Sequence, residues 1–221
     1  MITPKDKIIK FIKNSIETHS LYWQEVEYQK GNILFSQGET IEKLYFVKEG
    51  ILRSFGIDKR SGIEYTLEFI FADEAHIPMS AFNCWCPSMS GIQAIGNTNV
   101  IMEIDIEDWL NNLDGKDPLE MEKYAKSIEV GAMNDFVKHF VFDKSENKSS
   151  LKEYYHELKK QNHSLVNSDI DVQYLASYFL VNKRSMEKVI KEYKKENLPK
   201  NNFSAKFKEN AICTQKQKIC F

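Results

Sequence analysis

The stretch Asp171-Val-Gln-Tyr-Leu-Ala-Ser-Tyr-Phe-Leu-Val-Asn-Lys-Arg-Ser-Met-Glu-Lys-Val-Ile-Lys191 predicts a short helix, a tight turn and a second helix. Apolar residues recur at helical spacing in both parts, and Asn182 offers a side-chain oxygen at the start of the second helix. The second helix combines an apolar stripe of Met186, Val189, Ile190 and Tyr193 with cations on another face, namely Arg184, Lys188, Lys191 and Lys195. Such a helix can enter the major groove of DNA. The alternative is a charged surface helix of an ordinary small helical domain.

The composition of the 221 residues is that of a soluble globular protein, with 42% hydrophobic and 28% charged residues. No apolar run approaches the roughly 18 residues that would indicate a membrane span. The N-terminal residues alternate charged and apolar side chains and contain no uninterrupted apolar core of a signal peptide. We therefore expect a cytoplasmic protein without a membrane partner.

The charges are distributed unevenly along the chain. Residues 143–221 contain 16 Lys and Arg against 10 Asp and Glu, a balance of +6, whereas residues 1–142 contain 14 against 22, a balance of −8. This asymmetry indicates that the second part of the chain meets a polyanion. A solvated lysine-rich surface is the alternative.

The cysteines and histidines do not form a metal-binding or catalytic pattern. Cys84-Trp-Cys86 is spaced more tightly than a zinc knuckle, and Cys213 and Cys220 do not complete it. The histidines are scattered, and the sequence has no nucleophile elbow, phosphate-binding glycine loop or HExxH motif. We expect free thiols, no metal, no cofactor, no catalytic residues and no enzymatic activity. His76 as a ligand of haem or a metal is the alternative.

Residues from about 24 to 105 favour short β-strands. The expected strand segments are rich in β-branched and aromatic residues and are punctuated by glycines; they cover 26–35, 43–47, 51–57, 64–71 and 100–106. Many short strands at regular spacing predict an all-β roll, barrel or sandwich.

A long helix is predicted after the strands. Asp117 and Pro118 are typical of a helix start, and apolar residues then recur every four residues to about residue 142. Gly131 beside Ala132 allows another helix to approach closely. We expect a dimer interface formed by Tyr124, Ile128, Gly131, Ala132 and Phe136. Packing of this helix against its own β-domain is the alternative.

Three segments together resemble the Crp/Fnr family of bacterial transcription regulators. Gly38-Glu-Thr-Ile-Glu-Lys-Leu-Tyr-Phe-Val-Lys-Glu-Gly-Ile-Leu-Arg53 resembles the glycine-bounded hairpin of its β-roll, and Gly62-Ile-Glu-Tyr-Thr-Leu-Glu-Phe-Ile70 resembles the next strand. Gln173-Tyr-Leu-Ala-Ser-Tyr-Phe179 followed by Lys183-Arg-Ser-Met-Glu-Lys-Val189 is similar to its DNA-reading segment, in the version common among Bacteroidota.

The resemblance implies an α+β protein in three parts. These are a cyclic-nucleotide-binding-like β-roll of the double-stranded β-helix or jelly-roll type at 1–117, a dimerisation helix at 118–142, and a helix-turn-helix domain at 143–221 that ends in a polar tail, a candidate wing. It also implies a transcription regulator whose partners are double-stranded DNA, a second copy of the chain and an unknown small effector. RNA polymerase is a further candidate partner.

The resemblance assigns the DNA-binding residues and also shows two departures. It places Lys183, Arg184, Ser185 and Lys188 near base edges, with Lys191 near the backbone. Leu180 occupies the turn position where the family usually has glycine, and Glu187 stands where a small residue is usual. A ligand- or partner-binding module with degenerate DNA reading is therefore the alternative function.

The segment that corresponds to the family's phosphate cassette also departs. Residues 73–91 contain no Arg or Lys, so that no guanidinium there can hold a cyclic phosphate. The absence of cysteine before residue 84 also argues against an iron–sulfur sensor. We expect an effector other than cyclic AMP, in an apolar pocket lined by some of Ile77, Met79, Ser80, Phe82, Ser88 and Met89.

The substitution Ala132→Glu tests the expected dimer. A carboxylate at the centre of the pairing face should prevent the close approach of a second helix and give a monomer by light scattering. An unchanged dimer mass in the variant would mean that this helix packs only within its own chain.

Overall fold

The computed structural model describes residues 10, 12–14, 17, 23–76, 87–111, 148–161 and 170–197, and the account below is confined to them. The strands are β1 Trp23–Tyr28, β2 Ile33–Phe35, β3 Lys43–Glu49, β4 Ile51–Ile57, β5 Glu64–Phe71, β6 Ala75–His76, β7 Gly91–Ala94 and β8 Asn99–Asp105. The helices are α2 Ile106–Asn111, α4 Lys148–Gln161, α6 Val172–Tyr178 and α7 Lys183–Asn197. All the segments that the sequence predicted as strands contain strands here.

The strands form two four-stranded antiparallel sheets. The order is β1-β8-β3-β6 in the first sheet and β2-β7-β4-β5 in the second. Alternate residues of facing strands point between the sheets, and Leu44, Leu52, Ile70, Ile92 and Ile104 are completely buried in this shared core. This arrangement is a β-sandwich or roll, as the sequence predicted.

Two strands were missed by the sequence analysis because their local signals are weak. Strand β6 has only two residues, and β7 begins at Gly91. A Cβ atom at Gly91 would lie 2.5 Å from the Phe55 ring and 3.0 Å from the backbone oxygen of Phe35. The glycine that weakens the local strand signal is therefore required by close packing across the sheet.

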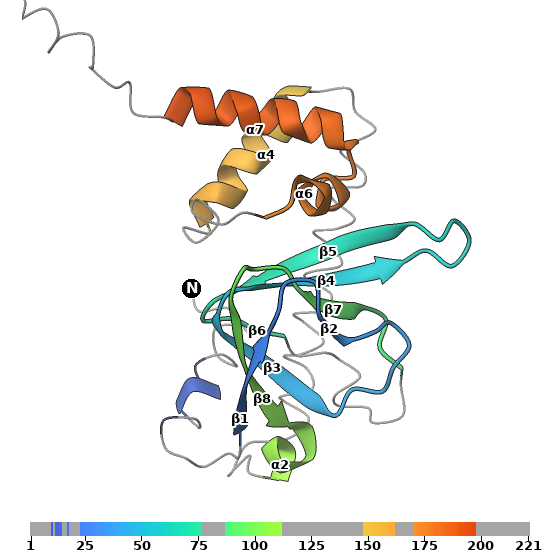
Figure 1. The fold of residues 1–221 in the computed structure, drawn as a ribbon, viewed down its shortest axis with the longest axis vertical. Helices are drawn as coiled ribbons and strands as arrows, with labels where there is room; N and C mark the ends of the chain where they lie inside the picture. Colours follow the sequence, from blue (N-terminus) through green and yellow to red (C-terminus); the bar gives the residue numbers. More distant parts are fainter. Residues whose placement is uncertain are drawn as a thin grey trace, which may run out of the picture.

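The described C-terminal helices form a separate layer on the outer face of the second sheet. Figure 1 shows α6 lying between β5 and α7, with α4 beside them. Buried residues of the β-roll and the helices form one cluster, to which the roll contributes Ile51, Phe69, Phe71 and Ile95, and the helical unit contributes Tyr155, Ile170, Leu175, Ala176, Phe179, Met186 and Val189. The two layers therefore share a hydrophobic core.

Tyr155 of α4 is part of this second core. It is 3% exposed and contacts Phe179 and Tyr193 edge to face, with ring centroids 6.5 and 5.3 Å away. Burial raises the pKa of Tyr155 to about 12, so the phenol is neutral at physiological pH.

Across the described residues, no helix has both the length and the apolar composition needed to span a membrane.

A buried amide joins three segments of the roll. Asn99 is only 1% exposed. Its Oδ1 accepts hydrogen bonds from the backbone amides of Ile51 and Gly96, and its Nδ2 donates to the carbonyls of Tyr28 and Gly96. All of the hydrogen-bonding capacity of the amide is used, and the strand starts at residues 51 and 99 are held together.

The substitution Asn99→Ala should lower the free energy of unfolding by about 2–4 kcal/mol, because buried groups lose their partners. Urea denaturation measures this loss. Asn97→Ala is the matched control, since Asn97 is exposed in the same turn and its loss should change stability by less than about 0.5 kcal/mol. Equal midpoints for the two variants would contradict the bracing role of Asn99.

Candidate functional site

The turn between α6 and α7 fixes the direction of α7. Helix α6 ends with hydrogen bonds from the Leu180 amide to the Ser177 carbonyl (3.2 Å) and from the Val181 amide to the Ala176 carbonyl (2.9 Å). This pair of hydrogen bonds is the Schellman motif, in which the residue directly after the C-cap of the helix adopts the left-handed conformation. Leu180 occupies that position with φ of 54°, at a cost of roughly 1–2 kcal/mol relative to glycine. The turn is therefore formed even though leucine replaces the glycine that is usual at this position.

Helix α7 begins at a capped residue and has two different faces. The Ser185 amide donates to Asn182 Oδ1 at 2.9 Å, which confirms the predicted cap. Met186 and Val189 are buried against the helical core, with Ile190 and Tyr193 packed beside them.

The opposite face of α7 presents the predicted cations. Lys183, Arg184, Lys188, Lys191 and Lys195 are exposed, while Ser185 is half-buried. None of these five cations forms an ion pair with another described residue. Glu187 is exposed on the same helix, so a carboxylate accompanies the cations. By contrast, Lys152 of α4 pairs with Glu196 near the other end of α7 at 2.5 Å.

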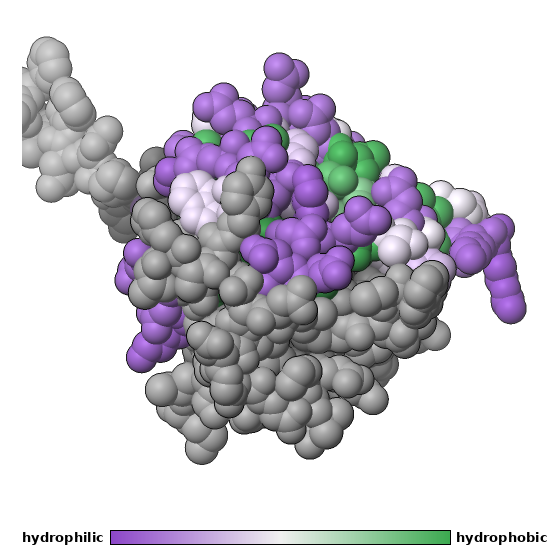
Figure 2. Space-filling model, turned by 90° about the horizontal axis from the view of Figure 1, so that it is seen from below, coloured by the Kyte–Doolittle hydropathy of each residue, from purple (hydrophilic) through white to green (hydrophobic). Residues whose placement is uncertain are grey.

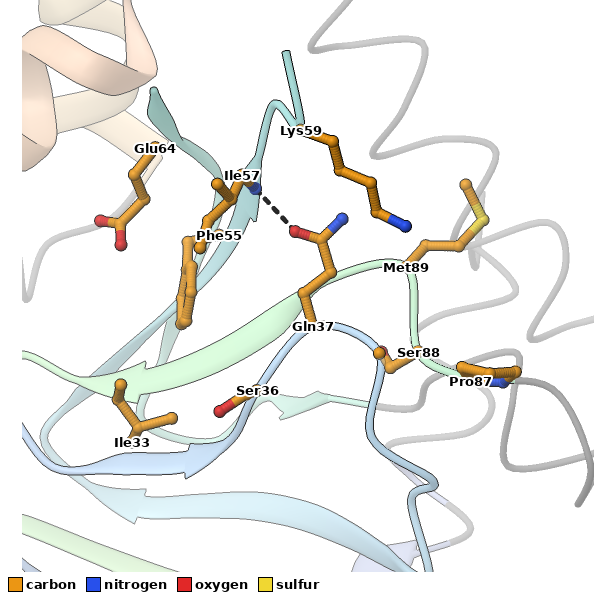
Figure 3. Close-up of a pocket in the computed structure, with 11 residues that line it drawn as sticks. Ile33, Ser36, Gln37, Phe55, Ile57, Lys59, Glu64, Pro87, Ser88 and Met89 are labelled. Atoms are coloured by element: carbon orange, nitrogen blue, oxygen red, sulfur yellow. Dashed lines mark hydrogen bonds between the residues drawn. The ribbon is translucent and has the colours of Figure 1, made fainter. Parts of the chain in front are cut away.

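A pocket of about 600 Å³ lies beside the β4–β5 hairpin. Figure 3 shows its walls, to which the hairpin contributes Phe55, Ile57, Lys59 and Glu64, and the segments opposite contribute Ile33, Ser36, Gln37, Gly38, Pro87, Ser88 and Met89. The Gln37 side chain accepts a hydrogen bond from the Ile57 amide at 2.7 Å and thereby joins two walls of the pocket.

The rim of the pocket is unusually apolar for an exposed surface. Ile33, Ile57 and Met89 are 53%, 42% and 65% exposed, and Ile63 in the hairpin turn is 51% exposed. Figure 2 shows hydrophobic residues gathered near the β4–β5 hairpin, which projects to the right and has a hydrophilic end. Clustered exposed apolar side chains of this kind are typical of a surface that binds a ligand or a partner.

The structure places two of the predicted pocket residues in this wall, Ser88 and Met89. The other four, Ile77, Met79, Ser80 and Phe82, lie outside the described residues, as do the dimer residues Tyr124, Ile128, Gly131, Ala132 and Phe136. The wall of the pocket also includes two charged residues, Lys59 and Glu64. The sequence-based prediction of an apolar pocket did not include them.

A buried arginine lies between the pocket and the helical layer. Arg53 of β4 is only 3% exposed, and its Nε donates to Gln93 Oε1 at 2.8 Å and its Nη1 to Thr66 Oγ1 at 3.1 Å. Its Nη2 donates to Glu64 Oε1, which also forms an ion pair with it. We call Arg53, Glu64, Thr66 and Gln93 the Arg53 cluster.

The Arg53 cluster contacts α6 directly. The Arg53 guanidinium carbon lies 4.1 Å from the ring centroid of Tyr174 and 5.0 Å from that of Phe55. A guanidinium held at this distance from an aromatic ring is attracted to it, more strongly when both are removed from water. Tyr174 is therefore positioned on the sheet by a charge that belongs to the β-roll.

Ser177 of α6 makes a second polar contact with the same strand. Its Oγ accepts from the Thr66 amide at 2.8 Å and donates to the Glu64 carbonyl at 3.3 Å. Nearby, the rings of Tyr178 and Phe69 have centroids 5.2 Å apart. Helix α6 is consequently docked on β5 by polar and aromatic contacts together.

Arg53, Tyr174 and Ser177 were not predicted from the sequence as functional residues. One signal was available, because Arg53 is a charged residue inside the strand Ile51–Ile57, whose first five residues are all buried. A charge within a buried strand needs partners, which points to an internal polar cluster. Its contact with α6 depends on a residue more than 100 positions away and leaves no local pattern.

Residues 25–114 match the family described as cyclic nucleotide-binding domain. The N-terminal sandwich therefore has the fold of that domain. A comparison with curated protein sequences found no match to the chain.

The fold of most of the chain is also found in solved structures of low sequence identity. FixK2 from Bradyrhizobium japonicum superimposes with a TM-score of 0.61 and 13% identity, over 80% of this chain and 87% of that chain. The c-di-GMP responsive global regulator CLP from Xanthomonas campestris gives 0.60 and 14%, over 84% and 93%. A CooA mutant from Carboxydothermus hydrogenoformans gives 0.52 and 14%, over 80% and 78%. At these identities the likeness shows the fold.

Proposed function

We propose that the chain is a DNA-binding transcription regulator of the Crp/Fnr type, controlled by a small effector other than cyclic AMP. The observation that carries the proposal is the division of α7 into two faces. Buried Met186 and Val189 attach the helix to its own core, and the opposite face presents Arg184, Lys188 and Lys191 to solvent, with Lys183 exposed in the first turn. A helix fixed in this way can enter a major groove while it stays packed on the described core.

The charges of α7 suit the two kinds of contact that DNA binding requires. Arg184 near the start of the helix has the planar donors that bind guanine in the major groove, and Lys191 one turn beyond Lys188 is suited to phosphates. Ser185 is half-buried and its amide is capped by Asn182, so of the five predicted DNA-binding residues it is the least accessible to a base edge. The positive balance of residues 143–221 favours the same partner.

The fold supports a regulator in which an effector domain and a DNA-binding unit occur in one chain. The described likeness covers most of FixK2 and of CLP, and CLP is described as a c-di-GMP responsive global regulator. We extend to this chain the general scheme of ligand-dependent regulation, with a homodimer formed through residues 118–142 and RNA polymerase as a further partner. Two copies would place their α7 helices in successive major grooves about 34 Å apart.

A ligand- or partner-binding module with degenerate DNA reading is the second candidate. The observation that favours it is Glu187, whose exposed carboxylate lies among the cations of α7 and would repel nearby phosphates. Leu180 no longer supports this candidate by itself, because the turn is formed with the strained residue in place.

Fluorescence anisotropy with DNA selected by the wild-type chain from a random pool tests the proposal. Arg184→Ala should weaken binding to the selected sequence by about 5- to 150-fold, the equivalent of roughly 1–3 kcal/mol. Lys191→Ala should instead weaken all sequences alike and reduce the slope of log K against log salt by about 1.

Lys30→Ala is the matched control, since Lys30 is an exposed lysine at the β1–β2 turn of the β-roll and is not part of α7. It should leave both the affinity and the salt slope unchanged. If the wild-type protein shows no salt-dependent DNA binding at low ionic strength, the proposed function is wrong and the result favours the second candidate.

Cyclic AMP should not bind at micromolar concentration. Lys59 and Glu64 offset each other in the described pocket wall, Arg53 already donates three hydrogen bonds, and residues 73–91 contain no Arg or Lys. Each missing charge-assisted hydrogen bond to the phosphate removes about 1.5–3 kcal/mol. Titration calorimetry measures this, with an authentic cyclic AMP-binding protein as the positive control. Heat consistent with micromolar binding of cyclic AMP to this chain would refute the proposal that the effector is not cyclic AMP.

A further inference from the structure

The pocket and the docking contact of α6 share one side chain. Glu64 lines the pocket and is 42% exposed, while its Oε1 accepts from the buried Arg53. Its backbone carbonyl accepts from Ser177 of α6. Figure 3 shows the Glu64 carboxylate beside Phe55, on the side of the pocket that faces the helical layer. One residue of β5 is therefore in contact with both the pocket and the helix.

The charge of Glu64 is needed by Arg53. A guanidinium that is 3% exposed is costly to bury unless a carboxylate neutralises it, and the other two acceptors, Gln93 and Thr66, are uncharged. The Tyr174 ring, 4.1 Å from the guanidinium, is held by the same arginine. Withdrawing the carboxylate would leave a buried charge uncompensated, and the guanidinium would have to move away from Tyr174 towards water.

We propose that Glu64 and Arg53 couple occupancy of the pocket to the docking of α6 on the β-roll. The ligand class that acts through this path has a cationic or hydrogen-bond-donating group directed at Glu64 and an apolar body against Ile57 and Met89. Such a ligand competes with Arg53 for the carboxylate and loosens α6, which carries α7 with it. This regulation rests on the proposed function of the pocket and of α7.

Covalent occupancy of the pocket tests the coupling without a known effector. Ile57 lines the pocket, is 42% exposed and is the cross-strand neighbour of Glu64. Ile57→Cys is made in a chain whose four native cysteines are serine, and is then labelled with 2-aminoethyl methanethiosulfonate. This reagent attaches a short chain that ends in an ammonium group within reach of Glu64.

The same variant labelled with propyl methanethiosulfonate is the matched control, because the added chain has a similar length and no charge. Hydrogen exchange of the amides in Val172–Tyr178 is the readout. The cationic label should accelerate this exchange at least tenfold relative to the neutral label, with β8 unchanged. Equal exchange rates for the two labels would overturn the coupling.

A second variant keeps the test decisive if the cysteine protein does not fold. Glu64→Gln retains the shape of the side chain but removes its charge, and should also accelerate exchange in Val172–Tyr178 at least tenfold. Lys59→Gln, a charge-removing change elsewhere on the hairpin wall of the pocket, should not. Unchanged exchange in Glu64→Gln would overturn the role of the pair.

DNA binding separates this inference from the proposed function. Wild-type binding together with an affinity changed at least threefold by the cationic label, but not by the neutral one, supports both. Wild-type binding with identical affinities for the two labelled proteins overturns the coupling alone. If the wild-type protein does not bind DNA, the proposed function fails, and the exchange measurement still decides whether the pocket acts on α6.

Discussion

The burial of one guanidinium constrains how α6 is placed on the second sheet, in addition to the apolar core that the two layers share. Arg53 cannot remain inside the protein without acceptors, and the strands supply them from β4's neighbours, Gln93 on one side and Thr66 and Glu64 on the other. Its remaining exposed surface is the flat face of the guanidinium, which is covered by Tyr174. Because the group is both satisfied and covered, the sheet has one favoured partner and one favoured orientation for it.

The position of α7 then follows from α6 through short-range geometry. Ser177 ties α6 to the backbone of β5, and the turn after Phe179 reverses the chain within a few residues. Leu180 accepts an unfavourable backbone conformation in this turn, and the buried Met186 and Val189 compensate by attaching α7 to the same core. The direction of the cationic face is thus set by the β-roll, although the roll itself does not touch that face.

Most of the helices and strands were predictable from the sequence, but their contacts were not. Periodicity identified α7 and its two faces correctly, because Met186 and Val189 recur at helical spacing and their environment is local. The Asn182 cap was predictable for the same reason. Strand β7 was missed, because Gly91 is selected by the Phe55 ring across the sheet and not by its own neighbours in the chain.

The pocket shows the same limit. Ser88 and Met89 were predicted from a family resemblance, whereas Ile33 and Glu64 enter the wall through sheet topology, since β2 and β5 are the outermost strands of one sheet and both approach residues 87–89. The Arg53 cluster could be suspected from a charge in a buried strand. Its contact with Tyr174 is a tertiary contact, which the periodicity of the sequence does not predict.

The docking of α6 also has a consequence for the colloidal behaviour of the chain. Strand β5 is at the edge of its sheet, and Ser177 satisfies an amide and a carbonyl of that edge that would otherwise be available to a strand of another molecule. The strand contains Tyr65, Leu67, Phe69 and Phe71, a composition that favours intermolecular β-pairing once the edge is uncovered. Any displacement of α6 would expose this edge, so the same contacts that dock α6 also protect the chain from intermolecular β-pairing.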